Sequence, residues 1–107
     1  MVSPNSDLMQ YAVIDRYTPL GARQIVFKFD NGFASSYVTD GRFPSIMLLR
    51  HKGNLYATVD ANLDEFDRFG IASPIHDDDV EALLRVVQGL HPDRSYIYKT
   101  PYEPFDP

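Results

Sequence analysis

Acidic side chains in the second half of the chain are the groups with the clearest potential for chemistry. Asp77, Asp79 and Glu81 have the spacing of the first, third and fifth ligands of a calcium-binding loop. The pattern then fails, because Ala82 replaces the glycine of the sharp turn and Gln88 replaces the bidentate glutamate at the twelfth position. The same acids precede an apolar helical pattern, where carboxylates stabilise the positive end of the helix dipole. We therefore expect a helix start here, with no metal and no other cofactor.

Other candidate catalytic groups lack the partners that catalysis needs. Asp60, Asp64 and Asp67 fall on one flank at helical spacing, and paired carboxylates can act as general acid and base when burial separates their pKa values. Charged residues are seldom fully buried, so a solvated surface is expected instead. No cysteine is present, and none of the three histidines lies in a motif that supplies a partner. The sequence predicts a protein without catalytic residues; a small carboxylate- or metal-dependent hydrolase is the alternative.

Basic and aromatic residues gather in the middle of the chain. Arg42, Arg50 and Lys52 with Phe43 and Tyr56 have the composition of a patch for single-stranded nucleic acid. Strand alternation is expected to scatter them over both faces of a sheet. The formal net charge of −5 also opposes binding to phosphate, which needs a basic footprint. Direct nucleic-acid binding is therefore not expected.

Charge is divided unevenly along the chain. Residues 1–59 carry four acids against six bases, whereas residues 60–107 carry eleven acids against four bases. The first part therefore has a net charge of +2 and the second a net charge of −7. Such an asymmetry bears on how a protein meets a partner rather than on a reaction.

Length and composition are typical of a single globular domain. The chain has 107 residues, 44% of them hydrophobic, which suffices for one core without a metal or a disulfide. The N-terminal segment has neither a basic nor an apolar run, so no signal peptide is expected. The longest apolar run, at 46–49, is far shorter than a membrane span. These features favour a cytoplasmic protein without membrane contact.

The elements that must position these residues are strands in the first half of the chain. Asn31-Gly32 between two alternating patterns predicts a type I′ hairpin turn, and Gly53 lies in a second turn. The continuous apolar run at 45–50 is typical of a strand covered on both faces. Strands are expected at 10–17, 24–29, 33–39, 45–50, 55–59 and 95–100.

Two helices are expected after position 60. Asn62 can cap a short helix, with Glu65 completing a capping box and Gly70 ending it. A longer helix follows the acids, with a core stripe at Val80, Leu83, Leu84 and Val87. The predicted fold class is α+β: an antiparallel meander of four or five strands with two helices packed on one face. Residues 1–107 form one domain, with 1–9 a flexible lead-in and 101–107 an extended, proline-rich C-terminal arm.

The segment from 27 to 90 resembles small, mostly uncharacterised phage-encoded proteins built from a hairpin, two further strands and a C-terminal helix. The resemblance rests on the Asp-Asn-Gly-Phe turn at 30–33, the apolar run at 46–49, the Gly-Asn-Leu turn at 53–55 and the acidic helix start at 78–81. The chain lacks their glycine-rich stretch after the second strand, and it adds an N-terminal strand and a C-terminal arm. The resemblance implies a phage or prophage origin and brings no catalytic residues.

These features favour a non-enzymatic protein-binding module. It would act stoichiometrically as an inhibitor of a host or antiviral-defence protein, for example of the CRISPR type, whose basic surface meets an acidic one. We expect a monomer or homodimer in the cytoplasm of the host cell; the alternative is a self-assembling structural or accessory phage protein. The expected partner-binding residues are Asp60, Asp64, Glu65, Asp67, Asp77, Asp78 and Asp79, with Tyr102 and Phe105 as apolar anchors.

Overall fold

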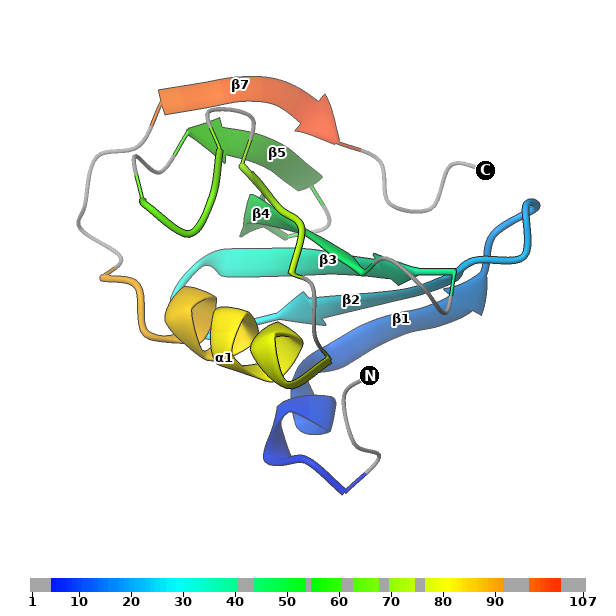
Figure 1. Cartoon of the computed structure of the whole chain (residues 1–107). Coiled ribbons are helices and arrows are strands. Elements are labelled where there is room, and N and C mark those ends of the chain that lie inside the picture. Colours follow the sequence, from blue (N-terminus) through cyan, green and yellow to red (C-terminus); the bar gives the residue numbers. More distant parts are fainter. Residues whose placement is uncertain are drawn as a thin grey trace.

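Strands follow one another along most of the chain, and the described part contains one α-helix (Figure 1). The computed structural model describes residues 5–40, 44–53, 55–60, 63–67, 70–74, 77–91 and 97–102; at 60, 77 and 97–102 it describes the backbone alone. The elements in chain order are the 3-10 helix η1 (Asp7–Tyr11) and then β1 (Ala12–Tyr17), β2 (Arg23–Lys28), β3 (Phe33–Thr39), β4 (Ser45–Lys52), β5 (Leu55–Asp60), β6 (Ile71–Ala72), α1 (Asp77–Gln88) and β7 (Ile97–Tyr102).

The sheet is antiparallel, and most neighbours in the chain are neighbours in space. The strand order is β1-β2-β3-β4-β5-β7, and β6 pairs with β4 beside this path. One edge of β4 is divided, because residues 49–52 pair with β5 whereas Ile46 and Met47 pair with β6. The prediction of an α+β fold with an antiparallel sheet is confirmed. The path has six described strands, and each overlaps one of the six expected ranges, so all six ranges join one sheet instead of the four or five predicted for it.

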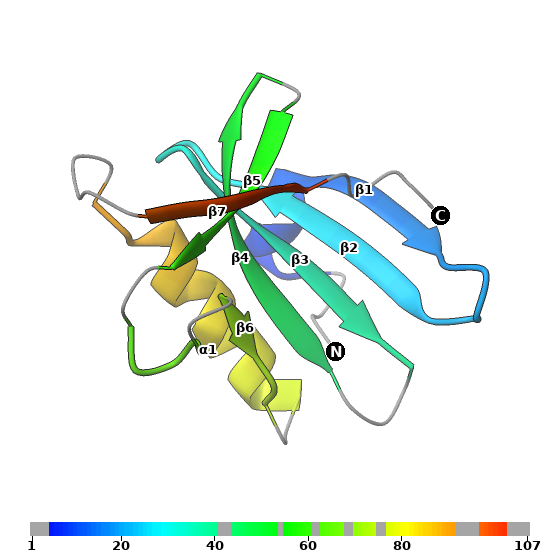
Figure 2. The same cartoon turned by 90° about the horizontal axis from the view of Figure 1, so that it is seen from above.

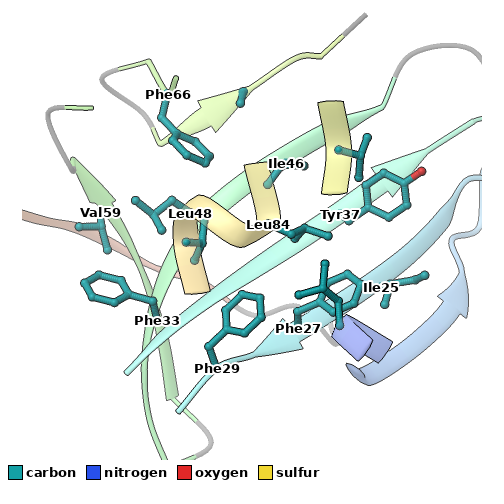
Figure 3. Close-up of a cluster of buried hydrophobic side chains, with 14 residues drawn as sticks. Ile25, Phe27, Phe29, Phe33, Tyr37, Ile46, Leu48, Val59, Phe66 and Leu84 are labelled. Atoms are coloured by element: carbon teal, nitrogen blue, oxygen red, sulfur yellow. The ribbon is translucent and has the colours of Figure 1, made fainter. Parts of the chain in front are cut away.

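The main core lies between the sheet and α1 (Figure 3). Phe27 of β2, Phe29 just after it, Tyr37 of β3 and Leu48 of β4 belong to one buried cluster with Leu84 of the helix, and none of these five is more than 1% exposed. Successive side chains along a strand point to opposite faces of the sheet, so the alternating apolar residues of each strand all lie on this one face. The helical stripe needed to cover it is the one that the sequence predicts.

The opposite face of the sheet has a smaller apolar cluster. Val26, Ala34, Leu49 and Tyr56 form it, and Met47 packs against them from β4. β4 thus carries buried apolar side chains on both faces, which confirms the interpretation of its continuous apolar run.

The second predicted helix is wrong. The described residues after β5, 63–67 and 70, make turn-type hydrogen bonds: Phe66 N–H donates to the Leu63 carbonyl at 3.2 Å, and Gly70 N–H donates to the Asp67 carbonyl at 2.9 Å. Asp67 also pairs with Ile71, since its N–H donates to the Ile71 carbonyl and its carboxylate accepts from the Ile71 N–H. The local helix signals are overridden by tertiary pairing with β4, because Leu48 N–H donates to the Gly70 carbonyl at 2.7 Å.

Part of the predicted lead-in, residues 5–9, is described and includes the beginning of a 3-10 helix. Ser6 caps η1 by accepting from the Leu8 N–H, and Leu8 is fully buried in the main core. An apolar side chain in a polar segment is a weak signal by itself, and it becomes an anchor here because β1 brings the segment beside the helix.

At the other end of the chain, Tyr102 is the last residue of β7, and positions 103–107 of the predicted arm lie outside the described residues.

The hairpin between β2 and β3 has a three-residue loop, not the predicted two-residue type I′ turn. Phe29 N–H donates to the Phe33 carbonyl at 2.9 Å, which leaves Asp30, Asn31 and Gly32 in the loop. Gly32 has φ +86°, the left-handed conformation that such loops place on glycine. The second predicted turn is confirmed, because Lys52 pairs with Leu55 across a two-residue connection.

Candidate functional site

An open groove of about 430 Å³ lies between α1 and the segment that carries β6. Asp79, Ala82, Leu83 and Val86 form its helical side. These positions have the i, i+3, i+4, i+7 spacing of one helix face. Glu65 and residues 72–74 form the facing wall. We call the apolar part of this lining the floor, and the groove has one carboxylate on each side of it; the floor consists of Ala72, Pro74, Ala82, Leu83 and Val86.

The helix presents this face because its other faces are occupied. Val80, Leu84 and Val87 point into the main core and are fully buried. The neighbouring face contacts the N-terminal segment, where Ser6 Oγ donates to Glu81 Oε1 at 2.7 Å. Leu83, predicted as a core residue, is only partly buried and contributes to both the core and the groove.

An ion pair ties the same helix face to η1. Arg85 Nη2 lies 2.7 Å from Asp7 Oδ1 and 3.4 Å from Glu81 Oε1. The hydrogen bond from Arg85 lowers the pKa of the Asp7 carboxyl below its usual value. Glu81 is thereby engaged on the side of the helix away from the groove lining, which leaves Asp79 as the helical carboxylate that lines the groove.

The C-terminal end of α1 is held by the β2–β3 hairpin. Asn31 Nδ2 donates to the carbonyl oxygens of Val87, Gln88 and Leu90 at 2.9, 3.0 and 3.0 Å. The Val87 and Gln88 carbonyls belong to the last turn of α1, whose carbonyls have no i+4 donor within the helix, so a side-chain donor that reaches them acts as a cap. Leu90 lies just beyond the helix, and its N–H donates to the Val87 carbonyl at 3.2 Å. The Asn31 side chain also accepts from the Phe33 N–H at 3.1 Å, which fixes the loop itself. The hairpin and the helix are thereby docked as one rigid support for the groove.

The facing wall depends on a close backbone approach at Gly70. This residue has φ +76°, and a Cβ there would lie 2.7 Å from the Val59 carbonyl oxygen and 3.3 Å from the Leu48 carbonyl oxygen. Only glycine allows the wall to approach β4 and β5 so closely. Phe66, which is 6% exposed, packs into the main core from the same wall.

The groove provides recognition chemistry of a defined kind. Its floor is built from aliphatic side chains and a proline, and the Glu65 and Asp79 carboxylates are exposed at its sides. An apolar side chain flanked by a lysine or arginine would match both features. Its volume falls within the roughly 300–1,000 Å³ that ligand pockets span.

The predicted site residues are divided by the structure. Glu65 and Asp79 are brought together at the groove. Asp64 and Asp78 are exposed but do not line it, and Asp67 holds its own turn through Ile71. The backbone of Asp60 ends β5, Asp77 begins α1 and Tyr102 ends β7, with side chains outside the described set; Phe105 lies outside the described residues altogether.

Sequence reasoning missed the apolar floor. Ala82 and Val86 extend the helical pattern sideways from the core stripe, which is a visible signal of a second apolar face. The wall residues Ala72, Ser73 and Pro74 carry no such signal, since their place follows from the pairing of β6 with β4.

A second, smaller cavity of about 110 Å³ lies at the β4–β5 hairpin and is lined by Arg50, His51, Lys52, Leu55, Tyr56 and Ala57. Alternation scatters these residues as expected, because Arg50 and Lys52 lie on one face of the sheet and Tyr56 lies on the other. Arg50 lies over the Phe33 ring, 5.0 Å from its centroid, and Tyr56 belongs to the opposite cluster, yet both reach the cavity at the hairpin end. Burial raises the pKa of the Tyr56 hydroxyl above its usual value.

Within the described part of the chain, no three acidic or histidine side chains converge on a common metal position. The helices described there are too short and too polar to cross a membrane. No protein-family model matches the chain, and no curated protein or solved structure shows significant similarity to it.

Proposed function

We propose that this is a phage- or prophage-encoded, non-enzymatic protein-binding module that inhibits a host or antiviral-defence protein stoichiometrically. The observation that carries the proposal is the groove, in which the Glu65 and Asp79 carboxylates flank an apolar floor. Its natural occupant is a segment of a basic partner surface with an apolar side chain beside a lysine or arginine. A surface of this kind is also what a nucleic-acid-binding protein presents to phosphate, so occupation by an acidic protein would compete with its substrate.

The charge distribution supports this direction of binding. The part of the chain that builds both walls of the groove carries the excess of acids, eleven against four bases in residues 60–107. Glu65 and Asp79 are exposed, so they act chiefly on the rate of encounter and on the choice of partner. The aliphatic floor supplies the contact that keeps the partner bound.

The test uses two pairs of charge reversals that change the net charge equally. Glu65→Lys with Asp79→Lys alters the groove, whereas Asp64→Lys with Asp78→Lys alters neighbouring exposed acids that do not line it. Wild type and both variants are immobilised and exposed to nuclease-treated lysates of bacteria that carry defence systems. Partners are quantified by mass spectrometry at low and high salt, and the recovered protein is then purified for calorimetry.

The proposal predicts that the wild type and the Asp64→Lys/Asp78→Lys variant, the control pair, retain a partner. The Glu65→Lys/Asp79→Lys variant, the groove pair, should lose that partner. Two exposed ion pairs contribute about 0.2–1 kcal/mol each, and reversal replaces attraction with repulsion. The groove pair should therefore cost about 0.8–4 kcal/mol and weaken binding roughly 4- to 700-fold, since about 1.4 kcal/mol corresponds to a factor of ten. The purified complex should have a one-to-one ratio and block nucleic-acid binding by the partner. Equal losses for both pairs would rule out the groove as the binding surface.

A further inference from the structure

The tip of the β4–β5 hairpin, defined by Lys52, Gly53 and Leu55, is an apolar projection beside a cation. Leu55 is 76% exposed although it is a large aliphatic residue. Lys52 is exposed and is the cross-strand partner of Leu55, so the two side chains share one face of the hairpin. This combination is the one that the groove was argued to accept.

The tip is held in place by contacts from the β2–β3 hairpin. Lys28 Nζ donates to the Gly53 carbonyl at 2.8 Å. His51 is fixed twice, because its N–H donates to the Gly32 carbonyl at 3.0 Å and its Nε2 lies 2.8 Å from the Phe29 carbonyl oxygen. A preordered projection loses little conformational entropy when it binds.

The tip and the groove lie toward opposite ends of the molecule. In Figure 2 the β4–β5 hairpin projects at the top, and β6 with the beginning of α1 lies in the lower middle part of the view. A tip therefore cannot reach the groove of its own chain. A contact between them joins two different surfaces of two copies, which is a head-to-tail arrangement that does not close as a symmetric dimer.

We propose that the hairpin tip of one copy occupies the groove of another, with Leu55 on the apolar floor and Lys52 between the Glu65 and Asp79 carboxylates. The inference rests on the proposed function only in using the same groove. Self-association then competes with the partner, so the protein is released for binding as it is diluted. A contact of this size is weak, and we expect a dissociation constant on the order of 0.1–1 mM.

The first test is sedimentation velocity on the whole protein across a concentration series up to about 2 mM, which spans the expected dissociation constant. Leu55→Asp should raise the dissociation constant at least about tenfold. The matched control is Leu20→Asp, since Leu20 is 98% exposed in the turn between β1 and β2 and plays no part in the contact. High salt should also weaken association, because the ion pairs are exposed.

The second test is a charge exchange. The Lys52→Glu variant and the Glu65→Lys/Asp79→Lys variant should each lose self-association. Mixing the two should restore association, because the unaltered tip of the second fits the unaltered groove of the first, and the acidic tip of the first fits the basic groove of the second. A wild type that stays monomeric over the whole range would overturn the inference, as would a mixture that fails to associate or a loss with Leu20→Asp. These results require no partner, so they leave the proposed function to be judged by its own experiment.

Discussion

Replacement of Gly70 by alanine should destabilise the protein far more than the same change at Gly21. Both residues have positive φ, +76° and +86°, so alanine pays the same backbone penalty at each, about 1–2 kcal/mol. They differ in surroundings, because a Cβ at Gly21 meets nothing within 4 Å, whereas one at Gly70 meets two backbone carbonyls. The difference between the two variants therefore isolates the close approach of the groove wall to the sheet.

The magnitude at Gly70 follows from what must move. The Val59 oxygen would lie 2.7 Å from the new Cβ and belongs to a paired strand, so the wall has to retreat. Retreat breaks the 2.7 Å hydrogen bond from Leu48 N–H to the Gly70 carbonyl, which contributes about 0.5–1.5 kcal/mol. It also loosens the packing of Phe66 in the core. We expect a total loss of at least about 3 kcal/mol, against about 1–2 kcal/mol for Gly21→Ala.

The assay is thermal and urea unfolding of both variants beside the wild type. About 1 kcal/mol corresponds to roughly 4–8 °C in the Tm of a domain of this size, so Gly70→Ala should lower Tm by about 12 °C or more. Gly21→Ala should lower it by about one to two thirds as much. Similar decreases for the two variants would refute the tight docking of the wall against Val59 and Leu48.

Three further predictions concern polar groups at defined places. Ser35 Oγ is buried without a hydrogen-bond partner among the described residues, so Ser35→Ala should leave the free energy of unfolding unchanged or raise it. Ser36→Ala removes the acceptor of a buried 3.0 Å hydrogen bond from Gln24 and should lower the free energy of unfolding by about 1–3 kcal/mol. Urea unfolding measures both. Asn31→Ala should cost about 1–3 kcal/mol by uncapping α1, and Asn31→Asp should be no better, because it sets a carboxylate against helix carbonyls; circular dichroism melts compare the two. The hydrogen bond from Arg23 lowers the pKa of the Asp15 carboxyl below 3.8 in the folded protein. The ion pair therefore contributes its full stability above pH 3.8, and this stability is lost as the pH falls through the lowered pKa. Lowering the pH from about 5 to about 2.5 should reduce the free energy of unfolding less in Asp15→Asn than in the wild type. Because the pair is exposed, the two reductions should differ by at most about 1 kcal/mol.

The strands and the long helix could be predicted because their signals are local and agree with the tertiary structure. Ile25, Phe27 and Phe29 alternate as a half-buried strand requires, and they do share one face. Val80, Leu84 and Val87 recur at helical spacing and reach the core as expected. In both cases the residues that set the local pattern are also those that the core needs.

The predicted second helix shows where local signals fail. Glu65 and Gly70 have the chemistry of a helix start and a helix end, yet residues 63–67 contain a turn and residues 70–72 pair with β4. Gly70 is used for its positive φ and its lack of a Cβ, and a capping glycine is indistinguishable from such a residue in sequence. The pairing with Leu48 spans distant parts of the chain, which no local pattern reports.

The candidate site was accessible from the sequence in part. The excess of acids led to Glu65 and Asp79, and the helical spacing of Ala82, Leu83 and Val86 could have revealed the floor. The pattern of acids in the sequence does not tell which of them lie close together. That depends on where the facing wall of the groove lies, and this position is set by the pairing of β6 with β4. Asn31 illustrates the same limit, since its turn chemistry is local but the helix carbonyls that it caps lie 56 or more residues away.

The central claim is that the partner binds in the groove between α1 and the β6 segment. The most direct measurement is hydrogen–deuterium exchange of the protein with and without the recovered partner, read by mass spectrometry of overlapping peptides. The proposed function predicts new protection in residues 72–74 and 79–86, with little change in β1, where Val13 and Tyr17 provide an alternative exposed apolar surface. Protection confined to β1, with residues 79–86 unchanged, would contradict it.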